Sequence, residues 1–283
     1  MLAELLLTAG ADLGEGPVWD PQANEVVWVD VLAGQVNRVS LEGKSGTSKT
    51  LPSAVGAVAS TVEGSWVGAI PTGLCRFHDY SLVSELPKMA DDLRMNDGKA
   101  DPVGRFVGGT MTTGQPRKEA GSLWSFDDQQ VQLLVDQVTI SNGLDWSADG
   151  QTMFYIDTPT QCIDAFDYDL TNGEVSNRRP WARIPPELGA PDGMCIDVEG
   201  GLWVALWGGG AVVRLEDGAI TERIEVPTPQ VTCPTFAGPN LDQLVITTAA
   251  TGLDPCSPGA GDLYLCSPGI SGNLANNLGS WAN

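Results

Sequence analysis

Residues 144–157 read LDWSADGQTMFYID, in which two short strand-like runs flank a turn centred on Asp149-Gly150. The second run is rich in aromatic and β-branched residues, as β-strands are. Glycine after an acidic residue is typical of a tight turn. A third run of the same kind, CIDAFDYD, follows at 162–169. This stretch therefore predicts a unit of strand, tight turn, strand and further strand.

The same unit recurs along the whole chain. Matching stretches are VWDPQANEVVWVD (18–30), AVASTVEGSWVGAI (57–70), GKADPVGRFVGGT (98–110), MCIDVEGGLWVAL (194–206) and FAGPNLDQLVITT (236–248). The units begin near residues 16, 56, 96, 142, 192 and 233, about 40 to 50 residues apart. This spacing is typical of propeller blades with about four strands each. We therefore expect an all-β fold, a six-bladed β-propeller that forms one domain over residues 1–283.

The N-terminal segment MLAELLLTAGADLGEG, residues 1–16, is expected to close the ring. It lacks the basic region of a signal peptide, and Glu4 and Asp12 interrupt its apolar residues. The segment has no partner in the first unit, so we expect it to supply the outermost strand of the last blade and leave no free sheet edge. Its leucines are expected to be buried. No apolar run approaches the ~20 residues of a membrane-spanning helix, so none is expected.

The net charge and the reactive side chains exclude several classes of function. The net charge of −21 would repel nucleic acid and acidic membrane surfaces, so neither is expected as a partner. The one histidine, His78, lies in LCRFHDY and is expected on the surface or in a loop, which disfavours Ser-His and Cys-His catalysis. The six cysteines form no CxxC pair and are expected as free thiols in a cytoplasmic protein, with a Cys256–Cys266 pair as the alternative.

Four polar residues occupy equivalent places in four units. Counting back eight residues from the turn glycines 104, 150 and 200 leads to Asn96, Asn142 and Asp192, and Glu15 lies nine residues before Asn24 in the first unit. The start of the innermost strand of each blade faces the propeller axis, so these side chains should converge at one mouth of the central channel. Two carboxylates and two amide oxygens form a donor set for a hard divalent ion.

Each of these residues also has a purely structural interpretation. Asn142-Gly143 and Asp192-Gly193 are common turn dipeptides. Arg94 lies two residues before Asn96, on the same side of a strand, where it would serve an oxygen-rich ligand or instead pair with Asp91 or Asp92. The tryptophans in the strand pattern are expected in packing between blades rather than in stacking on a sugar. They are Trp19, Trp28, Trp66, Trp124, Trp146, Trp203 and Trp207.

Four segments in this order resemble the signatures of the gluconolactonase, regucalcin and senescence-marker-protein family. They are LGEGPVWD (13–20), RMNDGKADPVGRFVGGTM (94–111), SNGLDWSADG (141–150) and PDGMCIDVEGGLWVALWGGG (191–210). The resemblance extends from Gly14 to about Leu265. It implies a six-bladed propeller with one divalent metal ion. Calcium, zinc, magnesium, manganese and iron all remain open as that ion.

The resemblance also implies roles for individual residues. Glu15, Asn142 and Asp192 match metal ligands, and Asp192 matches the general acid/base. Arg94 and Asn96 match positions that contact substrate, and Asn96 is also expected within reach of the metal. A substrate-binding glutamate found in the family is replaced here by Gly114. Glu119 would substitute for it only if its loop folded back over the site.

These features predict a metal-dependent hydrolase that opens a sugar lactone, an aldono-lactone, to the sugar acid, as a monomer or weak homo-oligomer. The metal would polarise the carbonyl and favour ionisation of water, Asp192 would transfer the proton, and Arg94 and Asn96 would hold the sugar or the developing oxyanion. One alternative is another ester or phosphotriester hydrolase with the same metal and a more apolar pocket. The other is a non-catalytic calcium-binding regulatory protein. A peptide-binding scaffold is disfavoured because the polar residues cluster at the channel.

Overall fold

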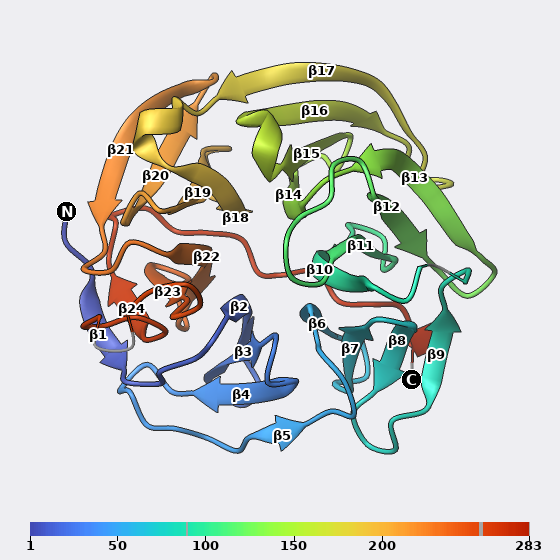
Figure 1. Cartoon of the computed structure of the whole chain (residues 1–283), viewed down its shortest axis with the longest axis horizontal. Coiled ribbons are helices and arrows are strands. Elements are labelled where there is room, and N and C mark those ends of the chain that lie inside the picture. Colours follow the sequence, from blue (N-terminus) through green and yellow to red (C-terminus); the bar gives the residue numbers. More distant parts are fainter. Residues whose placement is uncertain (89, 255–256, 283) are drawn as a thin grey trace.

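The computed structural model describes residues 1–88, 90–254 and 257–282, which form six antiparallel four-stranded sheets arranged in a ring (Figure 1). The strands of each blade are given from the innermost outward. Blade 1 contains β2 (Gly14–Asp20), β3 (Glu25–Asp30), β4 (Gln35–Val39) and β5 (Lys49–Thr50), and blade 2 contains β6 (Ala57–Ser60), β7 (Trp66–Ile70), β8 (Gly73–Arg76) and β9 (Leu82–Glu85). Blade 3 contains β10 (Leu93–Ala100), β11 (Phe106–Thr112), β12 (Gly121–Phe126) and β13 (Val131–Val138).

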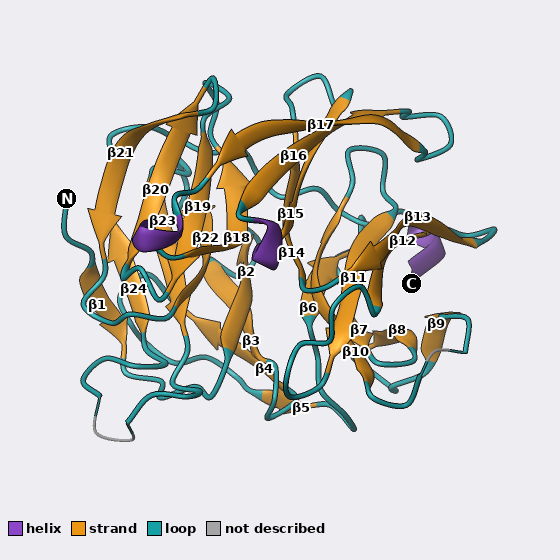
Figure 2. Cartoon of the chain, turned by 45° about the horizontal axis from the view of Figure 1, so that its top comes forward, coloured by secondary structure: helices purple, strands orange, loops and turns teal. Residues whose placement is uncertain are grey.

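Blades 4 to 6 continue the same pattern. Blade 4 contains β14 (Ser141–Trp146), β15 (Thr152–Asp157), β16 (Cys162–Tyr168) and β17 (Val175–Arg183), and blade 5 contains β18 (Ala190–Ile196), β19 (Leu202–Trp207), β20 (Ala211–Glu216) and β21 (Ala219–Glu225). Blade 6 contains β22 (Val231–Ala237), β23 (Gln243–Thr248), β24 (Leu263–Cys266) and β1 (Glu4–Leu7). The helices in the described residues are short 3₁₀ turns at Thr158–Thr160, Pro186–Leu188 and Ser280–Ala282 (Figure 2). The prediction of a six-bladed propeller is confirmed.

The N-terminal strand closes the ring as predicted. β1 pairs antiparallel with β24, with Glu4 opposite Leu265 and Leu5 opposite Tyr264, and this pair completes blade 6. The prediction that its leucines are buried is wrong for two of them, because Leu2 is 64% and Leu5 is 57% exposed. β1 is an outermost strand, so one of its faces points away from the neighbouring blade. Its contribution to closure therefore comes largely from pairing with β24.

Hydrophobic side chains pack between adjacent blades. In the described part of the chain they form six clusters, and each cluster joins residues of two neighbouring sheets around the ring. Trp203 is fully buried between blades 5 and 6, and Trp146 packs at 4% exposure between blades 3 and 4. The expected packing role is confirmed in the same way for Trp19, Trp28, Trp66 and Trp124.

The last residues of the chain cross one end of the central channel. We call residues 267–282 the C-terminal strap; in Figure 1 it runs in red behind the inner strands. Its Ser271 carbonyl accepts from the Val198 amide at 3.0 Å, the Leu278 amide donates to Ser60 at 2.8 Å, and the Gly279 amide donates to Gly104 at 2.9 Å. These partners lie where inner strands end, so the strap covers the mouth opposite the starts of those strands.

Candidate active site

The four polar residues predicted to converge do lie together, each near the start of an inner strand. Glu15 is on β2, Asn96 on β10, Asn142 on β14 and Asp192 on β18, and all four are between 5% and 7% exposed. Together with Arg94 on β10 they line one cavity of about 310 Å³. The counting rule from the turns thus identified residues that meet in space.

A β-bulge interrupts each of these strands at the site residue. The pairing register shifts between Glu15 and Val18 on β2 and, at the equivalent places, on β10, β14 and β18. A bulge bends the strand and changes the direction of a side chain, which is why bulges occur next to active sites. On β6 no such shift interrupts the pairing with β7, and Gly56 occupies the equivalent place before that strand. The local backbone thus distinguishes the four site strands from β6.

The glycines after Asn142 and Asp192 are required by close packing, not by turns. Gly143 and Gly193 lie inside strands β14 and β18. A Cβ on Gly143 would lie 2.6 Å from the Asp192 carbonyl oxygen, and one on Gly193 would lie 2.5 Å from the Cys233 sulfur. The turn-dipeptide alternative is therefore wrong, because the inner strands approach each other too closely here for a side chain.

A chain of hydrogen bonds orients the side chains. The Arg94 Nη1 donates to Asn96 Oδ1 at 2.7 Å, and Asn96 Nδ2 donates to the Ser141 carbonyl at 2.7 Å and to Asn142 Oδ1 at 3.3 Å. Asn142 Nδ2 donates in turn to the Thr158 hydroxyl at 2.9 Å. The alternative pairing of Arg94 with Asp91 or Asp92 is wrong, since Arg94 forms an ion pair with neither among the described residues, and Asp92 pairs with Arg117 outside the cavity. Arg94 instead holds Asn96 in place.

The two site carboxylates repel each other in a buried setting. Burial raises the pKa of the Glu15 carboxyl well above its usual range, and the charges of Asp192 and Asp97 raise it further. Burial likewise raises the pKa of Asp192, and Asp97 adds to it, although hydrogen bonds from Asn142 and the Gly193 amide oppose the shift. Arg94 partly offsets the negative charge of both groups. The site therefore favours a bound cation.

The donor chemistry fits a hard divalent ion. Glu15, Asn142 and Asp192 contribute oxygen atoms, which calcium, magnesium and manganese prefer. Within the described ranges, no three His, Cys, Asp or Glu side chains are grouped so that they could hold a metal. A cation here would therefore depend on the amide oxygen of Asn142 beside the two carboxylates.

The channel continues below the site with charged residues that the sequence analysis missed. Asp97, the next residue on β10, is buried, and its Oδ2 has no hydrogen-bond partner among the described residues. Further along, the Lys99 ammonium pairs with Asp145 at 2.8 Å. Burial opposes the charge of Lys99 most strongly, but Asp145, Cys233 and Cys195 together outweigh burial and raise the lysine pKa. The sequence could have indicated these residues. Asp97 and Lys99 follow Asn96, and Asp145 follows Asn142, at short intervals on the same inner strands.

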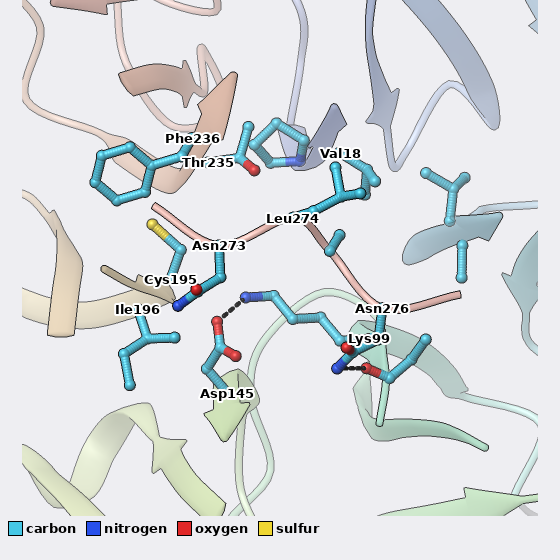
Figure 3. A pocket seen from close by; sticks show the side chains of 15 residues that line it. Val18, Lys99, Asp145, Cys195, Ile196, Thr235, Phe236, Asn273, Leu274 and Asn276 are labelled. Atoms are coloured by element: carbon cyan, nitrogen blue, oxygen red, sulfur yellow. Dashed lines mark hydrogen bonds and ion pairs between the residues drawn. The ribbon is translucent and has the colours of Figure 1, made fainter. Parts of the chain in front are cut away.

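The far mouth of the channel is closed by the strap. Figure 3 shows Asn273, Leu274 and Asn276 crossing beside the Lys99–Asp145 pair. They help to line a cavity of about 60 Å³, and Asn276 Nδ2 donates to the Ala100 carbonyl at 3.3 Å. Because the strap covers this end, a ligand reaches Glu15 and Asp192 from the mouth at which the inner strands begin.

Several other predictions can be compared with the structure. His78 lies in a turn with its side chain 68% exposed, as expected. Glu119 is exposed beside Lys118 and does not line the site cavity, whereas Gly114 does. Cys266 and the other four described cysteines are free thiols, and Cys256 lies outside the described residues. Trp207 lines the site cavity, so its assignment to packing between blades was incomplete. The described residues contain no helix long and apolar enough to span a bilayer.

Comparison with known proteins finds relatives along nearly the whole chain. The family model for the SMP-30/Gluconolactonase/LRE-like region matches residues 13–250. Regucalcin of Bos taurus is 39% identical over 262 residues, covering 89% of this chain and 88% of the relative. The structure of a calcium-binding protein, regucalcin from Agrobacterium tumefaciens, has a TM-score of 0.90 at 28% identity, covering 97% of this chain and 96% of that one. A luciferin-regenerating enzyme has a TM-score of 0.88 at 28% identity, covering 95% and 96%.

Proposed function

Since the chain belongs to the SMP-30/gluconolactonase/LRE-like family, we propose that it is a divalent-metal-dependent hydrolase that opens a lactone ring. The observation that carries this proposal is the convergence of Glu15, Asn142 and Asp192 in one cavity with an open mouth. Aldono-lactones, which the sequence analysis predicts, are the first substrates to test. The five described free thiols support a cytoplasmic location, because reducing compartments keep thiols free.

Glu15, Asn142 and Asp192 would hold the metal ion. A divalent ion bound there supplies positive charge that polarises an ester carbonyl and favours ionisation of water. The calcium-binding description of the Agrobacterium protein supports a divalent ion. The identity of the ion in this chain is to be measured by elemental analysis of the protein as isolated.

Asp192 is proposed as the general acid/base. Its raised pKa makes proton uptake easier than for an exposed carboxylate. In the proposed reaction Asp192 accepts a proton from the attacking water and returns it to the ring oxygen as the acyl–oxygen bond breaks. The product is a hydroxy acid, so the atoms of the water are fully accounted for in its new carboxyl and hydroxyl groups.

Arg94 and Asn96 are proposed to bind the reacting end of the substrate. Arg94 is 6% exposed, and its guanidinium is fixed by its bonds to Asn96 and the Met95 carbonyl. A fixed positive group in a buried site stabilises the negative charge that develops on the carbonyl oxygen. Since the guanidinium is already oriented, little reorganisation is needed when substrate binds.

Hydrolysis of another ester or of a phosphotriester is the second candidate function. The upper part of the cavity is lined by apolar side chains such as Leu13, Ile140 and Trp207. Such a wall would also suit an aryl ester or a phosphotriester. A non-catalytic calcium-binding role would require the ion but no turnover.

A pH-stat assay separates these functions. Protein freed of metal by a chelator, and the same protein reloaded with each divalent ion, would be tested on aldono-lactones, alkyl-substituted lactones, aryl esters and phosphotriesters. We expect lactone hydrolysis that disappears with the metal and returns with it. Full lactonase activity in a verified metal-free sample would contradict the metal requirement. Metal binding without turnover of any substrate would favour the regulatory role.

A further inference from the structure

The cavity has two chemically different parts. Its floor contains the charged and amide side chains, among them Glu15, Arg94 and Asp192. Its wall is formed by loops and strand ends of several blades and carries apolar side chains. They are Leu13, Leu32, Met111, Pro116, Ile140 and Trp207.

Few polar groups interrupt that wall. Of the described residues that line the cavity, Thr158 and Thr251 carry the hydroxyl groups, and every charged side chain belongs to the floor. Gly114 leaves open space, since a Cβ built there meets nothing within 4 Å. The Thr158 hydroxyl already donates to the Pro191 carbonyl and accepts from Asn142. A ligand hydroxyl at the wall would therefore find few partners.

Leu32 shows that the wall exposes apolar surface toward the mouth. It lies in the turn after β3 and is 46% exposed although it borders the cavity. A hydrocarbon group beside it removes apolar surface from water on both sides, which favours binding. A hydroxyl group at the same place loses its hydrogen bonds to water and gains none from the protein. One such unpaired group lowers affinity roughly 10-fold.

We propose that the substrate is a lactone whose part remote from the carbonyl is hydrocarbon, and not a fully hydroxylated aldono-lactone. This inference rests on the proposed lactonase function and narrows its substrate class. Trp207 alone could stack on the carbon–hydrogen face of a sugar. The five other apolar side chains of the wall offer no hydrogen-bond partner to the hydroxyl groups of that sugar. The polar floor takes the ester group, and the wall takes an alkyl or aryl substituent.

The test compares two lactones of equal ring size on the metal-loaded protein. One is δ-gluconolactone, and the other is a δ-lactone with a short alkyl chain on the ring carbon next to the ring oxygen. Each rate is divided by the uncatalysed rate under the same conditions. We expect kcat/KM to favour the alkyl lactone at least ~10-fold, as about two buried methylene groups would give. The matching δ-lactams, which resist hydrolysis, should show the same order in calorimetric binding.

Substitutions in the wall test whether its apolar side chains cause the preference for the alkyl lactone. Leu32→Asn should reduce the preference for the alkyl lactone several-fold, whereas Leu32→Met should retain it. Leu133→Asn is the matched control, because Leu133 is 45% exposed on the outer strand β13 and does not line the cavity. Equal or reversed preference in an active enzyme would overturn this inference and leave the proposed lactonase function intact. No turnover of either lactone would overturn both.

Discussion

Asp192 is a buried carboxylate that we propose as both a metal ligand and the general acid/base. Asp192→Asn keeps an oxygen donor and the shape of the side chain but removes the group that takes up a proton. Loss of general acid/base help lowers rates ~100- to 10,000-fold, so we expect kcat to fall within this range. The variant should fold, because it also removes one of the buried carboxylates that repel each other.

Two measurements check this prediction. Lactone turnover gives the change in kcat, and thermal unfolding after chelation compares the metal-free proteins. The variant should unfold at a temperature no lower than the parent protein at pH 8. Near-normal turnover would mean that another group carries the proton. A large drop in unfolding temperature would mean that the carboxylate is structurally required.

At the scale of single elements, β1 tests the closure of the ring. Deleting residues 1–8 removes the pairing with β24 and the half-buried Leu6 and Leu7, while the exposed Leu2 and Leu5 contribute little. Half-burial of two leucines is worth about 1.5–3 kcal/mol, a sizeable part of a typical net stability of ~5–15 kcal/mol. We expect a lower unfolding temperature and aggregation through the exposed edge of β24.

Substitution of the two exposed leucines provides the control. Leu2→Asn with Leu5→Asn keeps the β1 ladder and should leave the free energy of unfolding within about 0.5 kcal/mol per site. Thermal unfolding and light scattering would follow both proteins. A truncated protein that stays soluble with an unchanged unfolding temperature would refute the role of β1 in closure.

The C-terminal strap allows a second test on one element. Leu278 is fully buried in the cluster between blades 2 and 3, whereas Leu274 on the same strap is 48% exposed. Leu278→Ala should cost about 2–5 kcal/mol of unfolding free energy, as buried leucine truncations do. Leu274→Ala should cost less than about 0.5 kcal/mol. Denaturant unfolding measures both, and equal effects would show that the strap is not anchored at Leu278.

At the level of the whole molecule, the buried carboxylates at the axis predict that metal binding and stability are coupled. The folded-state pKa values of Glu15 and Asp192 are raised above their unfolded values. In the metal-free protein, stability contributed by these groups is therefore present at low pH and is lost as pH rises through the raised pKa values. A divalent ion bound between these groups would reverse this loss, and protons would compete with it at low pH.

We therefore expect the rise in unfolding temperature on adding a divalent ion to be larger at pH 8 than at pH 5. Scanning calorimetry of chelated and reloaded protein at both pH values measures it. The double variant Glu15→Gln, Asp192→Asn is the control, and in it both the pH dependence and the response to metal should shrink. A metal response that is the same at both pH values would contradict the proposed link.

The fold and the residues that converge in the site could be predicted from the amino-acid sequence. Its repeat is regular because every blade buries the same faces against its neighbours, so turn glycines and apolar strands recur at similar spacing. The rotational symmetry of a propeller then turns equal positions in the repeat into neighbours in space. Glu15, Asn96, Asn142 and Asp192 could be grouped for this reason, although their metal and catalytic roles remain proposals.

Features that do not repeat along the chain could not be predicted, because they depend on contacts between distant segments. The strap lies across the far mouth through hydrogen bonds with blades 2, 3, 5 and 6, and no local pattern in residues 267–282 specifies such distant partners. Trp207 resembles the packing tryptophans in sequence, yet it lines the cavity because β19 ends at the mouth. The apolar wall is likewise assembled from separate loops such as those of Leu32 and Ile140. Its chemistry depends on which side chains meet around the axis, and folding alone brings them together.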